Sequence, residues 1–275
     1  MKSMTLQRII SAILLIGLLI GVPFSARAAA EREATIPGRP DITTRALVVT
    51  PAPSTFQGPI RAAAILYVGG NGDLSAMKNN FLQRIRQRLA AAGLLLVIPD
   101  APSDRAGKNN LQGNFRASGD HAADARGLVQ FIKAQSNVAV FAIGTSRGST
   151  SAANTAARLG PDLIAGAALT ASVTHEGARG QISIYQTPVK DIKQPALVMW
   201  HEADACSETP PSDAPKLATA LTASSKVTVK TLSGGAPPRS GPCDALSPHG
   251  FLGIEDQAAA TILAWIDEVL IASGR

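Results

Sequence analysis

The sequence predicts an α/β fold: a doubly wound, mostly parallel sheet with helices on both faces. Short apolar runs alternate along the chain with segments of helical periodicity, and most of the apolar runs are continuous, as in strands buried on both faces. The 275 residues are 45% hydrophobic and 17% charged, which is typical of a globular chain able to bury a single core. No internal repeat and no linker divides residues 46–275, so we expect one domain there.

Seven segments are expected to form strands because they are short apolar runs bounded by Gly, Pro or polar turns. In chain order they span 46–51, 62–68, 94–98, 138–143, 164–171, 196–200 and 226–232. We expect the first to lie at an edge of the sheet. The last alternates between apolar and polar residues, whereas the others are largely apolar throughout.

Five segments are expected to be helical because apolar residues recur at every third or fourth position or because small residues predominate. They span 77–89, 120–134, 147–159, 214–222 and 255–272. Gly93 and the pair Gly160-Pro161 end the first and third of these helices. The segment 101–118, rich in Gly, Asn and Ser, predicts a long loop, and 172–194 predicts an irregular connection.

Residues 1–28 have the pattern of an export signal. Lys2 and Arg8 precede an apolar run over 9–22, and Ala-Arg-Ala at 26–28 fits the small-x-small cleavage pattern. A membrane anchor is the alternative, but the run is shorter than the roughly 20 residues that a span needs. We therefore expect cleavage, export to the periplasm or the cell exterior, and no stable membrane insertion afterwards. The polar segment 29–45 is expected to be a loose N-terminal lead.

The charge of the chain gives no sign of a nucleic-acid partner. The formal net charge is +6, and three of the basic residues lie in the signal, so the mature chain carries about +3. The remaining basic residues are scattered and are not interleaved with aromatic residues. This balance is too mild to predict binding to nucleic acid or to an anionic membrane. The sequence leaves the oligomeric state open.

The stretch Gly-Thr-Ser-Arg-Gly at 144–148 directly follows an apolar strand and precedes a helix of small residues. A sharp strand-to-helix turn exposes the hydroxyl of Ser146 above the sheet, and Gly144 and Gly148 let the strand and the helix approach closely. The helix N-terminus favours developing negative charge. A small residue in an ordinary loop is the alternative. We interpret Ser146 as the candidate nucleophile.

A serine hydroxyl needs a base, and the chain has four histidines. His249 is the candidate because it follows a long Pro/Gly-rich stretch and precedes the last helix. His121 begins a helix and is expected to be a capping or surface residue. His175 lies in the irregular connection, where it would at most line a pocket, and His201 ends a strand.

The base needs an orienting carboxylate, and Asp204 lies shortly after the strand 196–200. Glu202 is the second candidate, and a solvated loop carboxylate is the alternative for either. The two cysteines, Cys206 and Cys243, indicate a disulfide in an exported chain, with two buried free thiols as the alternative. The bridge would hold the Asp204 loop against the His249 loop.

An oxyanion site needs backbone N–H donors. One donor is expected from Arg147, and the other from the turn after the strand 62–68, first from Asn71 and second from Gly70. A phosphate-binding turn is a weak alternative, because no G-x-x-x-x-G-K-[ST] pattern is present. A metal site of His201, Glu202, Asp204 and Cys206 is a further alternative, but no H-E-x-x-H pattern supports it, and we expect no metal.

With these residues in this order, the chain from about 46 to 272 resembles the α/β-hydrolase superfamily. The resemblance implies the α/β-hydrolase fold, a Ser-His-Asp acyl-enzyme mechanism and no cofactor. The chain departs from many members in carrying Gly69-Gly70 where they carry His-Gly, which leaves the second oxyanion donor open. Serine at the elbow distinguishes the chain from the dehalogenase and epoxide-hydrolase branches. The connection 172–194 is too short for a full lid, so no large lid is expected.

The predicted function is that of a serine hydrolase, most simply a carboxylic ester hydrolase acting on a small ester-like molecule. A catalytically inert binding protein with the same fold is one alternative, and a peptidase or acyltransferase with the same triad is another. The loop 101–118 carries Asn109, Asn110, Asn114 and Arg116. We expect this loop to overhang the site and to favour a polar or acidic ester.

Overall fold

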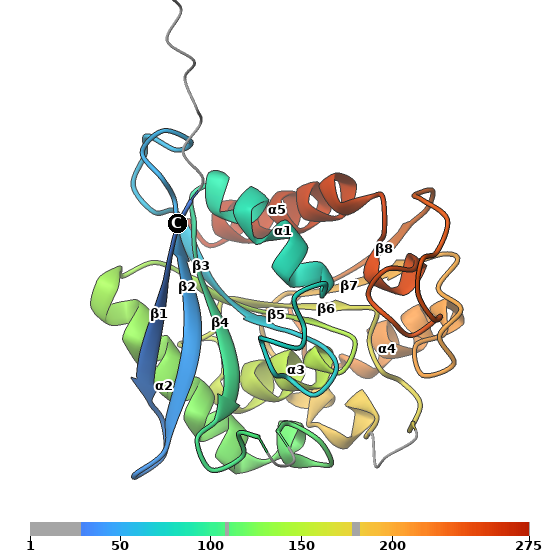
Figure 1. Ribbon diagram of the computed structural model, residues 1–275, viewed down its shortest axis with the longest axis horizontal. Helices are drawn as coiled ribbons and strands as arrows, with labels where there is room; N and C mark the ends of the chain where they lie inside the picture. Colours follow the sequence, from blue (N-terminus) through green and yellow to red (C-terminus); the bar gives the residue numbers. More distant parts are fainter. Residues whose placement is uncertain (1–28, 108–109, 178–181, 275) are drawn as a thin grey trace, which may run out of the picture.

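The computed structural model describes residues 29–107, 110–177 and 182–274. In this part of the chain, eight strands form one sheet in the order β1-β2-β4-β3-β5-β6-β7-β8, in which β1, β2 and β4 pair antiparallel and all other neighbours pair parallel (Figure 1). The strands are β1 (Ala30–Pro37), β2 (Thr43–Thr50), β3 (Ala62–Tyr67), β4 (Leu94–Pro102), β5 (Val140–Thr145), β6 (Gly166–Thr170), β7 (Ala196–His201) and β8 (Val227–Leu232). The prediction of a mostly parallel sheet is confirmed.

Helices cover both faces of this sheet. Figure 1 shows α1 (Phe81–Ala91) and α5 (Glu255–Ala272) on one face, and α2 (Gly119–Gln135), α3 (Gly148–Leu159) and α4 (Ala214–Ala220) on the other. The two helices on one face and the three on the other pack on separate apolar clusters, one on each side of the sheet. Every residue of β3, β4, β5, β6 and β7 is buried, because these strands have a helix layer on both sides.

The helix boundaries follow from local sequence. The side chain of Asn80 accepts a hydrogen bond from the Leu82 N–H at the start of α1, and Ser118 accepts one from the His121 N–H at the start of α2. Gly160 ends α3 with a positive φ of 73°, a conformation that costs glycine little. α5 begins and ends as the periodicity predicts, with Ile262, Trp265 and Ile266 buried against the sheet.

The expectation of a loose lead over 29–45 is wrong. Residues 30–37 form β1, and 43–50 form β2, which pairs with it antiparallel, so β1 and not the segment 46–51 is the edge strand. The physical reason is that most side chains of β1 face solvent. An edge strand of this kind needs no apolar run, so the apolar pattern does not reveal it.

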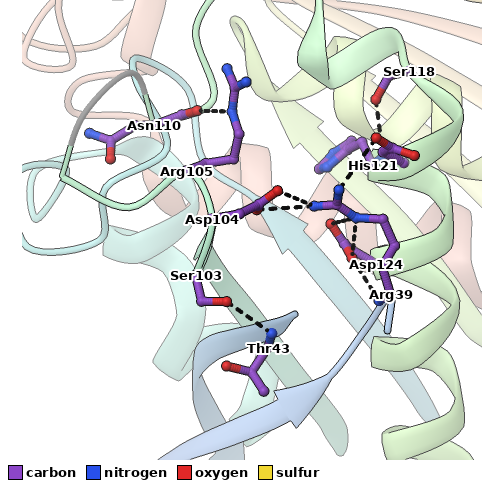
Figure 2. Close-up of polar contacts among 10 residues, drawn as sticks. Arg39, Thr43, Ser103, Asp104, Arg105, Asn110, Ser118, His121 and Asp124 are labelled. Atoms are coloured by element: carbon purple, nitrogen blue, oxygen red, sulfur yellow. Dashed lines mark hydrogen bonds and ion pairs between the residues drawn. The ribbon is translucent and has the colours of Figure 1, made fainter. Parts of the chain in front are cut away.

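Arg39 lies in the turn between β1 and β2 and connects this hairpin to α2 and to the loop after β4 through hydrogen bonds (Figure 2). Its guanidinium pairs with Asp124 on α2 at 3.0 Å, with Asp104 after β4 at 3.0 Å and with Asp120 at 3.3 Å. The Asp124 carboxylate also accepts the Arg39 backbone N–H. These carboxylates raise the pKa of Arg39, chiefly through the hydrogen bond to Asp124.

The two long connections predicted at 101–118 and 172–194 are irregular, but the first is shorter than expected. β4 continues through Pro99 to Pro102, so the following loop is shorter than expected. In the described part of 172–194, short 3₁₀ turns occupy Ile184–Gln186 and Val189–Asp191, and no large lid is formed there. Residues 1–28, with the predicted export signal, lie outside the described residues. None of the helices in the described ranges has the length and apolarity needed to cross a bilayer.

Candidate active site

Ser146 lies at a sharp turn between the end of β5 and the start of α3. Its φ is +53°, in the left-handed region that a non-glycine residue seldom adopts and that is found at strained functional sites. A Cβ at Gly144 would overlap the backbone of Gly148, and one at Gly148 would overlap the carbonyl of Tyr67 on β3. Both glycines are therefore required for the close approach of strand and helix.

Asp204 and His249 meet beside this turn although they are far apart in the sequence. Asp204 lies three residues after β7, and its side chain is fully buried. His249 lies in the 3₁₀ turn Pro248–Gly250, and its Nδ1 is 2.9 Å from Asp204 Oδ2. Glu202 is exposed, and it does not line the cavity that holds Ser146 and His249. The structure thus brings His249 to Asp204 and not to the second acid candidate.

Thr209 is a member of this cluster that the sequence did not predict. Its hydroxyl donates to Asp204 Oδ2 at 2.9 Å and lies 3.1 Å from His249 Nδ1. The Cys206 backbone N–H donates to the other carboxylate oxygen, Oδ1, at 2.9 Å. Both oxygens of the buried Asp204 are therefore hydrogen-bonded, which fixes the plane of the carboxylate against the imidazole. No motif marks Thr209, since only the path of the loop brings it back to the acid.

Ser146 and His249 line one cavity of about 240 Å³. Gly69 and Gly70, from the turn after β3, line it as well. The remaining wall is mixed in polarity and consists of Ala76, Met77, Asn79, Asn80, Phe81, Thr145, Cys243, Asp244, Ala245 and Gly250. The candidate nucleophile, the candidate base and the glycine turn therefore face a common space at the carboxyl ends of the strands, where parallel sheets of this class bind ligands.

The three predicted oxyanion donors have backbone N–H groups available. Within the described ranges, the N–H groups of Gly70, Asn71 and Arg147 donate to no protein acceptor. The turn itself is closed by a hydrogen bond of 3.3 Å from the Gly72 N–H to the Gly69 carbonyl. Of the two turn candidates, Gly70 lines the cavity and Asn71 is not among its lining residues. Their roles as donors stay predictions.

The predicted disulfide between Cys206 and Cys243 is present, and the alternative of two free thiols is wrong. The bridge joins the loop that carries Asp204 to the loop that carries His249, and its cysteines have a sequence separation of 37 residues. Because the Cys206 N–H donates to Asp204 and Cys243 lines the cavity, the bridge is part of the wall of the site.

His201 and His175 do not line the cavity that holds Ser146, and each contacts other groups. His201 Nε2 lies 2.9 Å from the Gly234 carbonyl, and its Nδ1 accepts the Ala203 N–H. His175 is about half exposed and contacts Asp213 at 2.7 Å. The four alternative metal ligands do not converge: Cys206 is in the disulfide, His201 bonds backbone groups, and no metal-holding cluster occurs in the described part of the chain.

His121 is not the capping or surface residue that we expected. Its side chain is buried between Tyr67 and Phe115, with ring centroids 5.7 and 5.4 Å away. Burial, together with the positive charges of Arg116 and Arg39, lowers the pKa of His121 to about 3. Helix periodicity alone did not predict this, because the ring is covered by a loop folded back from β4 onto α2.

The expectation that the loop 101–118 overhangs the site with Arg116 is also wrong. Arg116 is only 1% exposed and Asn110 only 9%, because the loop packs inward against α2 and α3. Asn114 is exposed, and Asn109 lies outside the described residues. The Asn110 carbonyl accepts a hydrogen bond from Arg105 (Figure 2). The guanidinium of Arg116 is therefore buried in the protein, hydrogen-bonded to Ser151 and to backbone carbonyls, and it does not overhang the site.

Several solved hydrolase structures are similar to this chain in fold. The chain is similar to the Pyrococcus furiosus esterase Pf2001, with 11% identity, a TM-score of 0.61 and coverage of 89% of this chain and 90% of that one. It is also similar to the dienelactone hydrolase of Anabaena variabilis, with 14% identity, a TM-score of 0.58 and coverage of 90% and 99%. No protein-family model matches the chain, and no curated protein matches it in sequence.

A third similar structure is an acylaminoacyl peptidase in complex with a chloromethyl ketone, with 13% identity and a TM-score of 0.61. The match covers 88% of this chain but 42% of the peptidase, so it concerns one part of that protein. At these identities the likeness concerns the fold, and the chain has the α/β-hydrolase fold that its sequence predicted.

Proposed function

We propose that the chain is a serine hydrolase that cleaves an ester-type acyl bond through Ser146, His249 and Asp204. One observation carries the proposal: Ser146, held at a positive φ, shares a cavity with His249, whose Nδ1 lies 2.9 Å from the buried Asp204. The strand-to-helix turn, the base and the orienting acid are the parts of a triad, which is defined by geometry and roles. The esterase and hydrolase folds to which the chain is similar support the same class.

In the proposed reaction, the hydroxyl of Ser146 attacks the acyl carbonyl while His249 Nε2 accepts its proton. The hydrogen bond from Nδ1 to Asp204 fixes the tautomer and stabilises the imidazolium. The backbone N–H of Arg147 and that of Asn71 or Gly70 hold the carbonyl oxygen as it becomes an anion. His249 then protonates the leaving group, and water releases the acyl group from Ser146 with the same proton transfers.

The proposed substrate is a small ester. The cavity of about 240 Å³ has the volume of a small organic molecule, and Met77 and Phe81 give its wall an apolar part. The neighbouring Asp244 is unfavourable for an anionic acyl group close to Ser146. A neutral, short acyl chain suits this combination of size and charge. No cofactor enters the proposed reaction.

A peptidase is the second candidate, and the likeness to an acylaminoacyl peptidase favours it. The two activities use the same triad and differ in the leaving group, an alcohol for an ester and an amine for a peptide. An acyltransferase would differ from both in the acceptor that replaces water. An inert binding protein is disfavoured, because the serine, the histidine and the acid are all retained in a connected arrangement.

A substrate panel tests the proposal. Hydrolysis of p-nitrophenyl acetate and butyrate, a matching thioester and an acyl-alanine p-nitroanilide is measured for the unchanged protein, Ser146→Ala and Asp204→Asn. Glu202→Gln is the matched control, because Glu202 is an exposed carboxylate two residues from Asp204 that does not line the cavity. We expect ester turnover that falls by several orders of magnitude in the first two variants and is unchanged in the control. Faster anilide hydrolysis would indicate a peptidase, and no turnover of any member would contradict an enzyme.

We also propose that the protein works outside the cytoplasm. A disulfide that joins the two catalytic loops is stable in an oxidising compartment, which agrees with the predicted export signal at 1–28. Mass spectrometry of the protein from fractionated cells tests this. A mature N-terminus at Ala29 in the periplasm or medium is expected, and intact, reduced protein in the cytoplasm would contradict it.

A further inference from the structure

Arg116 is buried without an anionic partner next to the candidate site. Its side chain is 1% exposed, and its guanidinium donates to the carbonyls of Val68 at 3.2 Å and Gly70 at 3.3 Å and to Ser151 Oγ at 2.7 Å. Its Nε has no partner among the described residues. Arg39 is the contrasting case in the same protein, since carboxylates surround its guanidinium (Figure 2).

An unpaired buried guanidinium is costly, so its retention calls for an explanation. Taking a charge from water without an opposite charge costs several kcal/mol even when neutral acceptors replace part of the hydration. Burial lowers the pKa of Arg116 to about 9, and the charge of Arg147 adds to that effect. An apolar residue of similar size would fill the space at lower cost. The bonds that Arg116 makes must therefore serve something other than packing.

The acceptors of Arg116 lie on the two structures that build the oxyanion site. Val68 and Gly70 belong to the turn after β3, and Ser151 lies on α3, the helix that begins behind Ser146. A Cβ at Gly72 would lie 3.1 Å from Arg116 Nη2, so the turn is closely fitted to the guanidinium. Arg116 thus joins the turn to the nucleophile helix across the interior of the protein.

The planar peptide bond gives these bonds a direction. In a trans peptide the N–H of one residue points opposite to the C=O of the residue before it. When the Gly70 carbonyl faces Arg116, the Asn71 N–H points away from Arg116, and the same holds for Val68 and the Gly69 N–H. The N–H of Asn71 has no protein acceptor in the described part of the chain. The hydrogen bond from Arg116 to the Gly70 carbonyl thus constrains the peptide plane that carries the Asn71 N–H, one of the two donors predicted for the turn.

We infer that Arg116 is a positioning residue for the oxyanion site, which holds the Gly69–Gly72 turn in register with α3 and directs the Asn71 N–H toward the substrate oxygen. The inference rests on the proposed hydrolase function. Arg116 is expected to affect the stability of the transition state more than substrate binding, because the N–H stabilises the carbonyl oxygen most when that oxygen carries negative charge. Loss of Arg116 then lowers kcat and leaves KM nearly unchanged.

Two variants separate the geometry of the guanidinium from its charge. Arg116→Lys keeps a positive charge but cannot reach two carbonyls and Ser151 together, and Arg116→Gln loses both the charge and the fork. Arg39→Gln is the control, because it removes an equally anchored arginine of the same fold and touches no residue of the cavity. The melting temperature of all three variants is measured. The kcat of an Arg116 variant is then compared with that of Arg39→Gln at a similar loss of melting temperature.

The readouts are kcat and KM for p-nitrophenyl acetate and the inhibition constant of a trifluoromethyl ketone. The ketone reports on the oxyanion site because Ser146 Oγ bonds to its carbonyl carbon, the proton passes to His249, and the carbonyl electron pair becomes an alkoxide. We expect kcat to fall about 10-fold in Arg116→Lys and about 100-fold in Arg116→Gln, within the range for loss of an oxyanion donor. The inhibition constant rises by similar factors, KM stays within about twofold, and Arg39→Gln keeps the original kcat.

A folded Arg116 variant with unchanged kcat and inhibition constant would overturn the inference, as would an equal loss of kcat in Arg39→Gln at equal melting temperature. Arg116→Lys preserves the charge and the hydrophobic stem, and it carries the test if Arg116→Gln does not fold. Failure of the proposed function is distinct, since the unchanged protein would then show no Ser146-dependent ester hydrolysis at all.

Discussion

Removal of the disulfide is expected to weaken both the fold and the site. The bridge closes a loop with a sequence separation of 37 residues, for which the chain-entropy model gives about 4 kcal/mol of stabilisation. That is a large fraction of the 5–15 kcal/mol typical of a domain. The perturbation is the double variant Cys206→Ala/Cys243→Ser, chosen because Cys206 is buried and Cys243 is exposed.

The effect on activity follows from two contacts of the bridge. The Cys206 N–H donates to Asp204 Oδ1, and Cys243 lines the cavity six residues before His249. Without the bridge, the two loops are held together mainly by the bonds of Asp204 and Thr209 to His249. We therefore expect kcat for p-nitrophenyl acetate to fall about 10-fold at 25 °C, the scale on which positional errors of catalytic groups act.

Urea unfolding followed by tryptophan fluorescence measures the stability, with oxidised and reduced unchanged protein compared beside the double variant. The reduced protein should match the double variant in both stability and kcat, which separates loss of the bond from effects of the new side chains. A loss of stability below about 1 kcal/mol would refute the loop-closure reasoning. Full kcat with the expected loss of stability would refute the role of the bridge in positioning Asp204 and His249.

Three further predictions concern single residues. His121→Phe keeps the aromatic packing and removes a group whose pKa of about 3 lies below the ordinary 6.5. Below pH 6.5 the histidine takes up a proton in the unfolded state but not in the native state. The free energy of unfolding therefore falls by roughly 1.4 kcal/mol per pH unit as the pH falls from 6.5 toward 3. Between pH 7 and 5, the variant should lose about 2 kcal/mol less in urea unfolding than the unchanged protein, and parallel losses would contradict the buried neutral state. Thr209→Val removes a hydrogen bond to Asp204 and should lower kcat about 10-fold at nearly constant KM, worth roughly 1.4 kcal/mol; an unchanged kcat would show that Thr209 does not orient the acid. Gly148→Ala places a Cβ against the Tyr67 carbonyl and should destabilise the fold by about 2 kcal/mol or more in thermal unfolding, whereas an unchanged melting temperature would contradict the close strand–helix contact.

The central sheet was predictable from the sequence because its strands are buried on both faces. Continuous apolar runs such as those of β5 and β7 identify such strands without knowledge of their neighbours. Ser146, Asp204 and His249 were predicted because each follows a strand of the predicted sheet, and the structure places His249 beside Asp204 and in one cavity with Ser146; their catalytic roles stay predictions. The Cys206–Cys243 pair was predicted from composition and compartment and agrees with the disulfide in the structure.

The features that the sequence did not reveal depend on contacts between distant segments. β1 is mostly solvent-exposed, so its pairing with β2 and its anchor through Arg39 leave no apolar pattern. Arg116 and His121 carry polar, titratable side chains, and both were therefore expected near the surface. They are buried because the loop after β4 packs against the turn after β3, to which Leu111 and Arg116 donate hydrogen bonds, and local periodicity does not encode this contact.

The most direct test of a nucleophilic Ser146 is mass spectrometry after reaction with a fluorophosphonate. The unchanged protein, with its disulfide verified by a thiol count, is compared with Ser146→Ala and with the exposed control Glu202→Gln. We expect a single phosphonyl adduct that maps to Ser146, is absent from Ser146→Ala and forms at the original rate in Glu202→Gln. No adduct on folded, oxidised protein, or an adduct that persists in Ser146→Ala, would contradict this expectation.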